Sequence, residues 1–414
     1  MRKKMKDSGI EWAGNVPEDW KIIELRYATK QINESNNPIK FENILSLTNT
    51  QGVIPYEEKG NLGNISKSDI SQYKIAYKNT VIINSMNLKI GSVGLSNYDG
   101  CVSPVYYVLK NRKNSDIKFI NYIFQSSFQK YLSKYGKGIM EIREKIPMYD
   151  VLHSYIPFPK LEEQKRIVNF LDDKCSKIDK AIELNKKAIE EEKEYKQSYI
   201  DNMIEGKNDK LIKLKFIADF NKGLSITKDD LKEEGLAVVS YGQIHSKEND
   251  RVSIKDNLIR FVDEDYLKYE HSKVTYGDFI FADTSEDYDG VGNAVYNNKK
   301  DMPIYAGYHT IIVRINNNFH NKKYLAYLFN SAKWRKQLRE CVTGIKVFSI
   351  SQKMLKDTFV RIPSSDEQDK IVNRLDKICN EIDQMIEIRQ KYIEQLQEYK
   401  KSLIYEAVTG KIEV

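Results

Sequence analysis

The chain has few cysteines, and none is arranged for metal or redox chemistry. Its four cysteines, at 101, 175, 341 and 379, form no CxxC motif and no cluster with histidine at metal-ligand spacing. No segment approaches the ~20 consecutive apolar residues that a membrane span needs, and the charged N-terminus has no apolar segment behind it. We therefore expect no bound metal, reduced core cysteines at Cys175 and Cys379, and a soluble cytoplasmic protein.

The motifs of nucleotide and methyl-transfer chemistry are also missing. The phosphate-binding pattern GxxxxGK[ST] does not occur. A methyltransferase acting on adenine needs a glycine-rich loop for S-adenosylmethionine and an Asn/Asp-Pro-Pro-aromatic loop for the flipped base, and neither string is present. Glu57-Glu58-Lys59 matches a nuclease-like ExK, but so does Glu191-Glu192-Lys193 in a predicted helix, so chance explains the match. We predict no catalytic residues, which disfavours a fused modification–restriction enzyme.

What the sequence does contain is a long internal repeat. Moving residues 159–207 forward by 204 positions places them without a gap on residues 363–411, and 23 of the 49 aligned pairs are identical. A repeat whose period is close to half the chain indicates a two-fold duplication and not a solenoid. At 414 residues the chain has room for two to four domains.

Each copy of the repeat has the pattern of one long helix. Acidic residues at 162 and 163 stand in the first turn after Pro159, where they favour the helix dipole, and no Gly or Pro follows until Gly206. About 45 residues would give a helix of ~65–70 Å, and that length without internal caps is typical of a coiled coil. The apolar positions predicted to form the helix-pairing stripe and to support subunit docking are Ile167, Leu171, Ile178, Ile182, Ile189, Ile371, Leu375, Ile382, Ile386 and Ile393.

The regions before each helix resemble one another more weakly and mix strand and helix patterns. Residues 78–83 and 102–109 are rich in β-branched and aromatic residues and predict strands, and 117–134 has helical spacing. The second region repeats this order through strands at 276–282 and 305–313 and a helix at 323–338, and we expect His309 to be a core histidine within the last strand. The predicted fold class is α+β: two mixed α/β domains at 1–158 and 208–362, and two long antiparallel coiled-coil helices at 159–207 and 363–414.

Two unlike domains, each followed by a nearly identical long helix, resemble the specificity subunit of Type I restriction–modification systems. The local stretches that carry the resemblance are Ser8-Gly9-Ile10-Glu11-Trp12 with Trp20, Glu162-Glu163-Gln164 and Glu367-Gln368 at the helix starts, and Glu406-Ala407-Val408-Thr409-Gly410-Lys411. The resemblance covers essentially the whole chain. It implies a non-catalytic DNA reader in which each domain is a target recognition domain for one half of a split, asymmetric sequence.

The same resemblance implies the partners and cofactors. The helices would fix the distance between half-sites on double-stranded DNA and dock two methyltransferase subunits, which use S-adenosylmethionine to methylate adenine N6. Two restriction subunits, with ATP and Mg²⁺, can complete such a complex, while this chain itself would bind no cofactor. The net charge of +7 fits a salt-dependent phosphate affinity.

Candidate DNA-contacting residues lie in matching loops of the two domains, where amide, hydroxyl and basic side chains can reach phosphates or base edges. In the first domain they are Asn84, Ser85, Asn87, Lys89, Lys134, Lys137, Arg143 and Lys145. In the second domain they are Thr284, Ser285, Asp287, Tyr288, Arg335, Arg339, Lys346 and Ser349. Ordinary solvated loops remain an alternative for each residue, and a coiled-coil adaptor with two protein- or carbohydrate-binding domains remains an alternative for the whole chain.

Overall fold

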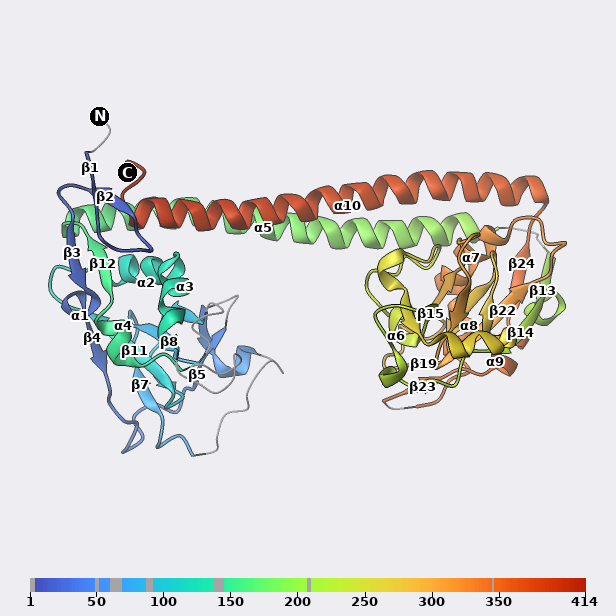
Figure 1. The fold of residues 1–414 in the computed structure, drawn as a ribbon, viewed down its shortest axis with the longest axis horizontal. Coiled ribbons are helices and arrows are strands. Elements are labelled where there is room, and N and C mark those ends of the chain that lie inside the picture. The colour runs from blue at the N-terminus through green and yellow to red at the C-terminus, as the bar shows by residue number, and fades with distance from the viewer. Residues whose placement is uncertain are drawn as a thin grey trace. The chain divides into compact units, whose positions relative to one another are not determined.

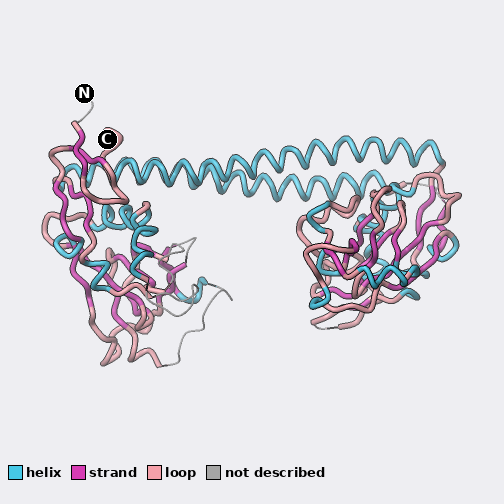
Figure 2. Tube along the Cα trace, viewed as in Figure 1, coloured by secondary structure: helices cyan, strands magenta, loops and turns pink. Residues whose placement is uncertain are grey.

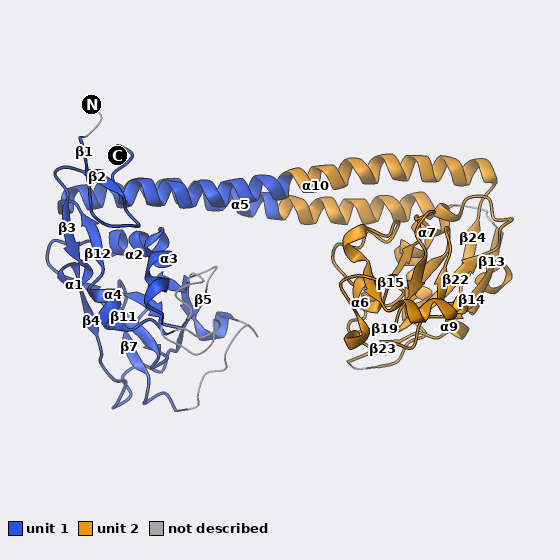
Figure 3. Ribbon diagram, in the orientation of Figure 1, with its two compact units in different colours: residues 1–186, 389–414 blue, residues 187–388 orange. Residues whose placement is uncertain are grey.

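The computed structural model describes residues 4–48, 52–59, 69–86, 92–136, 145–206, 210–344 and 346–414 (Figure 1). The chain divides into two compact units, residues 1–186 with 389–414 and residues 187–388 (Figure 3). Helices and strands occur together in both units (Figure 2), as the predicted α+β class requires. Each unit combines one globular domain with parts of both long helices. The sequence predicted each long helix as a segment of its own, whereas packing divides each helix between the two units.

The first unit is built around a four-stranded antiparallel sheet. Its strands, in spatial order, are β4 (Thr29–Ile32), β11 (Tyr106–Asn111), β8 (Val81–Asn84) and β9 (Val93–Leu95). Two-stranded pairs flank it: β1 (Met5–Asp7) with β2 (Asn15–Pro17), β3 (Lys21–Glu24) with β12 (Tyr155–Phe158), β5 (Leu45–Thr48) with β6 (Gly52–Pro55), and β7 (Lys74–Ala76) with β10 (Gly100–Val102). Strand β8 is buried over its whole length, because Val81, Ile82 and Ile83 place apolar side chains on both faces of the sheet.

The second unit repeats this topology. Its central sheet has the order β14 (Ala218–Lys222), β22 (Thr310–Ile315), β18 (Phe279–Ala282) and β20 (Ala294–Tyr296). A second sheet orders β16 (Arg260–Val262), β15 (Leu236–Val239), β21 (Ile304–Ala306) and β17 (Lys273–Val274), and β13 (Lys210–Lys213) pairs with β24 (Phe359–Ile362). The weak sequence echo between the two regions is therefore a true repeat of fold.

Four segments predicted as continuous elements are interrupted, and one of them is the strand at 305–313, which is divided between β21 and β22. The predicted helix at 117–134 is α2 (Ile117–Gln125) and α3 (Phe128–Leu132), and that at 323–338 is α7 (Lys322–Asn330) and α8 (Ala332–Arg339). The side chains of Ser126 and Ser331 hydrogen-bond the preceding turn and so compete with helix continuation. The predicted strand at 102–109 breaks between β10 and β11 at Ser103-Pro104-Val105, because proline has no N–H for the ladder.

Helices α5 (Leu161–Ile204) and α10 (Ser365–Val408) are each continuous over 44 residues, as predicted. Of the ten predicted stripe residues nine are buried, and Ile386 is half-buried. In the second unit Ile371 and Leu375 belong to the same hydrophobic cluster as the sheet and α7. In the second unit the helix stripe therefore packs against the domain near the start of α10 and is not only a helix-pairing surface.

The two helices are antiparallel within each unit. In the first unit Lys400 Nζ lies 2.6 Å from Asp179 Oδ1, and Arg389 donates to Asn185 at 3.2 Å. In the second unit Lys196 Nζ lies 2.7 Å from Asp383 Oδ2, and this pair is the repeat equivalent of the first ion pair. The duplication therefore preserves pairing contacts as well as sequence.

A repeated polar contact fixes each domain on its own helix. The side chain of Gln164 accepts a hydrogen bond from Asp116 N at 2.8 Å, and Gln368 accepts one from Asn321 N at 3.2 Å. Tyr327 in α7 donates to Asp376 at 2.6 Å, as Tyr122 does to Asp172 at 2.7 Å. Burial, followed by these hydrogen bonds to carboxylates, raises the pKa of both tyrosines. The glutamine and the aspartate are therefore the same in both copies of the repeat because each makes the same contact with its domain.

The cysteines give a direct test of this packing. Cys101, Cys175 and Cys379 are buried, and burial raises the pKa of each thiol to about 11, whereas Cys341 is exposed. Because the thiolate is the reactive form, a thiol-specific reagent at pH 8 should label Cys341 rapidly and the other three only after denaturation. Counting labelled thiols by mass spectrometry checks this, and rapid labelling of Cys175 or Cys379 in the native protein would show that the helix packing is wrong.

Candidate nucleic-acid interface

In the second unit the structure brings together the two loops that the sequence singled out. Strand β19 (Thr284–Ser285) pairs with β23 (Phe348–Ser349), although more than sixty residues separate them in the chain. The N–H of Ile350 also donates to the carbonyl of Asp283 at 2.8 Å. The loops therefore form one continuous ridge beyond β18.

The outer side of this ridge is polar, aromatic and exposed. Asp287, Tyr288, Lys346 and Ser349 are all exposed. The ring of Tyr288 lies edge-on to Phe348 with centroids 5.6 Å apart, and the guanidinium of Arg339 lies 5.9 Å from the Tyr288 centroid. Such a surface offers donors, acceptors and stacking area in one place, which is what contact with nucleic acid requires.

Two predicted contact residues of the second unit lie inside the domain instead. Arg335 is buried, and its guanidinium donates to Asn293 Oδ1 at 2.7 Å and to the carbonyls of Val291 and Asp289. Ser285 is also buried, and its hydroxyl donates to the Asp287 carbonyl at 2.7 Å. These side chains hold the ridge in shape from below and do not face solvent, which corrects their predicted role as contact residues.

A cluster of arginines gives this region positive charge. Burial, and then the neighbouring Arg251 and Arg339, lowers the pKa of Arg335 to about 9. Burial and Arg339 likewise lower the pKa of Arg251, which donates to Asn330 at 2.8 Å. The acidic outer loop thus lies close to a concentrated positive charge, in which Arg251 and Arg339 are partly exposed and Arg335 is buried.

Sequence reasoning missed the cavity beside the ridge. A cavity of about 580 Å³ is lined by residues 222–226, Asp283, residues 307–311 and residues 350–353. His309 lies here and not in the core as expected: its side chain is 58% exposed, its φ is +54°, and its Nδ1 is 3.2 Å from Asp283 Oδ1. Its predicted strand is interrupted between β21 and β22, so the histidine occupies a loop. A non-glycine residue with positive φ beside a cavity is a sign of a functional position. This sign is visible in the backbone conformation and not in the sequence.

In the first unit the described part of the predicted site is smaller. Asn84 and Ser85, which the sequence predicted to contact DNA, are buried. The Ser85 hydroxyl donates to Val105 O at 3.1 Å, and neither side chain faces solvent. Lys145 is exposed, and burial followed by Lys145 lowers the pKa of Lys74. Lys134 lies 3.7 Å from the Tyr131 ring centroid and 3.4 Å from Glu11. The predictions for Asn87, Lys89, Lys137 and Arg143 fall outside the described residues.

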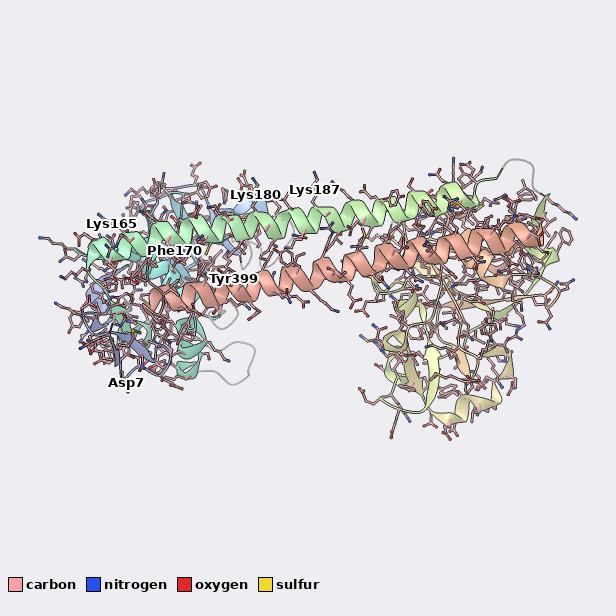
Figure 4. The ribbon with its side chains drawn as sticks, turned by 90° about the horizontal axis from the view of Figure 1, so that it is seen from above. Asp7, Lys165, Phe170, Lys180, Lys187 and Tyr399 are labelled. Carbon is pink, nitrogen blue, oxygen red and sulfur yellow. The ribbon has the colours of Figure 1, made fainter. Side chains whose placement is uncertain are left out.

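Both long helices expose large apolar residues at repeat-equivalent positions. Tyr195 and Tyr399 are each 57% exposed, and Leu184 and Ile388 are 58% and 67% exposed. Met385 and Tyr392 continue the stripe on α10. Figure 4 labels Tyr399 on α10 together with Phe170 and Lys180 on α5 in the same unit. On α5 the counterparts of Met385 and Tyr392 are Ala181 and Ala188, so the two helices share two large exposed apolar positions. These shared positions indicate a repeated interaction surface.

Two further features were looked for among the described residues. Within the described ranges, no group of three His, Cys, Asp or Glu side chains is arranged to hold a metal ion. None of the helices among those ranges is long and apolar enough to cross a membrane.

Comparison with protein families identifies the domain that occurs twice. The profile of the Type I restriction modification DNA specificity domain matches residues 17–193 and again residues 207–397. The chain belongs to this family. The two matched segments each contain one globular domain and most of the helix that follows it, so the family unit is domain plus helix.

Individual relatives agree over nearly the full length. The Type I restriction enzyme MjaVIII specificity subunit of Methanocaldococcus jannaschii is 26% identical over 96% of this chain and 94% of that protein. A chain from a structural study of complex assembly in the type I R-M system shares 16% identity with a TM-score of 0.73, over 96% of this chain and 99% of that one. The HsdS subunit from Thermoanaerobacter tengcongensis has 16% identity and a TM-score of 0.53, over 96% and 98% of the two chains. These structures confirm the predicted fold.

Proposed function

We propose that this chain is the non-catalytic sequence-recognition subunit of a Type I restriction–modification complex. The observation that carries the proposal is the pair of specificity domains with conserved helix contacts and unlike outer loops. The contacts that fix each domain on its helix are the same in both units, whereas the second unit's outer loop has an acidic sequence, Asp283–Tyr288, in place of Asn84–Lys89. Conserved positioning with divergent loops is what reading two different half-sites requires.

Two unlike readers make an asymmetric, bipartite target. A symmetric dimer would read a palindrome, because its two recognition surfaces are identical. The exposed Asp287 can accept a hydrogen bond from cytosine N4, while Lys346 and Arg339 supply phosphate contacts or guanine contacts. On this proposal the ridge of β19 and β23, with His309 beside it, is the reading surface of the second domain.

The repeated apolar stripes on α5 and α10 support docking of two copies of one partner. The proposed partners are two methyltransferase subunits, which would bring S-adenosylmethionine for adenine N6 methylation, while restriction subunits would bring ATP and Mg²⁺. The chain itself would bind none of these cofactors and would act in the cytoplasm, where the chromosomal DNA lies.

The decisive experiment is purification with the methyltransferase partner followed by mapping of methylated adenines in DNA exposed to the complex. We expect methylation at one bipartite, non-palindromic sequence and salt-sensitive binding to that sequence. Methylation or binding without sequence preference would overturn the proposal. Binding only to proteins or glycans would favour the coiled-coil adaptor.

Replacing one exposed lysine of the ridge should weaken binding without changing its specificity. Lys346→Ala removes one candidate phosphate contact, so we expect a loss of roughly threefold to tenfold for cognate and unrelated DNA alike, and a salt slope smaller by about one. Fluorescence anisotropy between 50 and 200 mM salt measures both. Lys187→Ala on α5 removes the same charge away from the ridge and is the matched control. An unchanged slope for Lys346→Ala would remove this residue from the interface.

A further inference from the structure

A second cavity, of about 600 Å³, lies in the second unit and shares no lining residue with the cavity beside the ridge. Its wall combines the end of α5, the start of α8, and strands β13 and β24. Leu211, which is 63% exposed, and Phe359, which is 47% exposed, lie at its edge. Leu328 and Trp334 contribute buried apolar surface. None of these residues is a DNA-contact candidate or part of the helix stripes.

The internal repeat shows what covers the equivalent surface in the first unit. There the segment that contains Trp12 packs against α3, with the rings of Trp12 and Phe128 5.1 Å apart at their centroids. The indole Nε1 donates to the carbonyl of Tyr155 at 3.2 Å, and the hydroxyl of Ser127 donates to the carbonyl of Trp12 at 3.3 Å. Tyr155 and Ser127 are the counterparts of Phe359 and Ala332, which line the cavity.

The same segment also covers the end of α10, the counterpart of the end of α5. The hydroxyl of Tyr405 donates to the carbonyl of Ala13 at 3.3 Å. A Cβ placed on Gly410 would meet Pro17 at 2.5 Å and Trp20 at 3.0 Å. The covering segment therefore contacts the backbone directly at this glycine, which leaves no room for a side chain. Figure 1 shows the N-terminal strands beside the C-terminal end of α10. Tyr405 and Gly410 correspond to Asp201 and Gly206 in the cavity wall.

The second unit has no such segment among its described residues, because its chain passes from α5 to β13 through a short link. The first unit has a lead-in of about twenty residues before β3, whereas α5 ends at Ile204 and β13 begins at Lys210. The covering segment buries Ile10, Trp12, Ala13, Val16 and Trp20. The fold therefore has a binding surface for an aromatic segment that is filled by the chain itself in one unit only.

The covering segment of the first unit indicates what the occupant of the cavity would be. Its residues 10–14 form a hydrogen-bonded turn that carries Trp12, with the N–H groups of Ala13 and Gly14 donating to the carbonyl of Ile10. The cavity offers such a segment apolar wall surface at Leu328 and Trp334. We propose that this cavity is the docking site for a turn-forming segment of a partner protein that carries a tryptophan side chain, in the manner of residues 8–20 in the first unit. One such segment would bind per chain.

The test uses the full chain without DNA and a synthetic peptide of residues 4–20 as the probe, so its outcome is independent of the proposed DNA reading. Isothermal titration should show one peptide per chain with Kd below about 1 mM. Leu211→Asp, which places a charge at an exposed edge position of the cavity, should weaken binding at least tenfold. Trp12→Ala in the peptide should do the same. Leu267→Asp, at an exposed leucine outside the cavity lining, is the matched control and should bind as the parent chain does.

Several results would overturn the proposal. One is the absence of saturable binding. Another is unchanged binding to Leu211→Asp, because this result would mean that the peptide displaces the resident segment of the first unit. Equal affinity for N-acetyl-tryptophanamide would also do so, because it would make the cavity a small-molecule site. A circular dichroism melt of each variant shows that lost binding does not reflect lost folding.

Discussion

Inserting four residues into both long helices, after Lys186 and after Gln390, is expected to lengthen the DNA spacer by one to two base pairs while both half-site sequences stay unchanged. These positions are repeat equivalents and lie beside the hydrogen bond between Asn185 and Arg389. Four helical residues add ~6 Å, and one base pair of B-DNA adds ~3.4 Å. Because four residues are close to one helical turn, the Lys400–Asp179 and Lys196–Asp383 pairs keep their faces.

Methylation mapping with a library of spacer lengths measures this effect, and activity on the parental target should fall by at least a hundredfold. The control is the same insertion in α5 alone, which leaves the paired helices out of step and should lower stability without producing a new defined spacer. A double insertion that keeps the parental spacer would show that the helices do not set the distance between half-sites.

Replacing Arg335 by alanine is expected to destabilise the second unit by about 2–4 kcal/mol. The change removes the hydrogen bonds to Asn293, Val291 and Asp289 and leaves their oxygens without this donor. Because those residues follow the ridge loop directly, we also expect loss of selectivity at one half-site only. Urea denaturation gives the free energy of unfolding, and methylation mapping gives the selectivity of each half-site.

Lys130→Ala is the matched control for this variant, because residue 130 is exposed at the corresponding place in the first unit and should change stability by less than about 0.5 kcal/mol. The outcome separates the two roles considered for Arg335. A variant that keeps its stability but loses DNA affinity would restore the direct base contact that the sequence suggested.

The long helices were predictable because their signal is periodic and uninterrupted. Leu171 and Leu375 recur at core positions of a segment without Gly or Pro, and both are fully buried. The shorter helices were less predictable, since Ser126 and Ser331 look neutral in a helical pattern and act only through local hydrogen bonds to the preceding turn. The start of α5 at Leu161 agreed with the prediction because proline and acidic residues mark it.

The candidate interface shows a different limit. Both loops of the second unit were found from their polar composition, but composition could not distinguish the exposed Tyr288 from the buried Arg335. The burial of an arginine depends on carbonyls supplied by residues more than forty positions away. His309 was misplaced for the same reason, because its neighbours are strand formers while its own backbone has positive φ.

By itself, the sequence determined the duplication, the helix pair and the family, because repeats and hydrophobic periodicity are properties of order along the chain. Tertiary structure alone decided which loop side chains reach solvent and which hold the loop from beneath, since burial is set by residues distant in sequence. It also decided that the surface covered by the Trp12 segment in one unit is a cavity in the other. Two surfaces of common origin differ there because only one of them is preceded by enough chain to cover it.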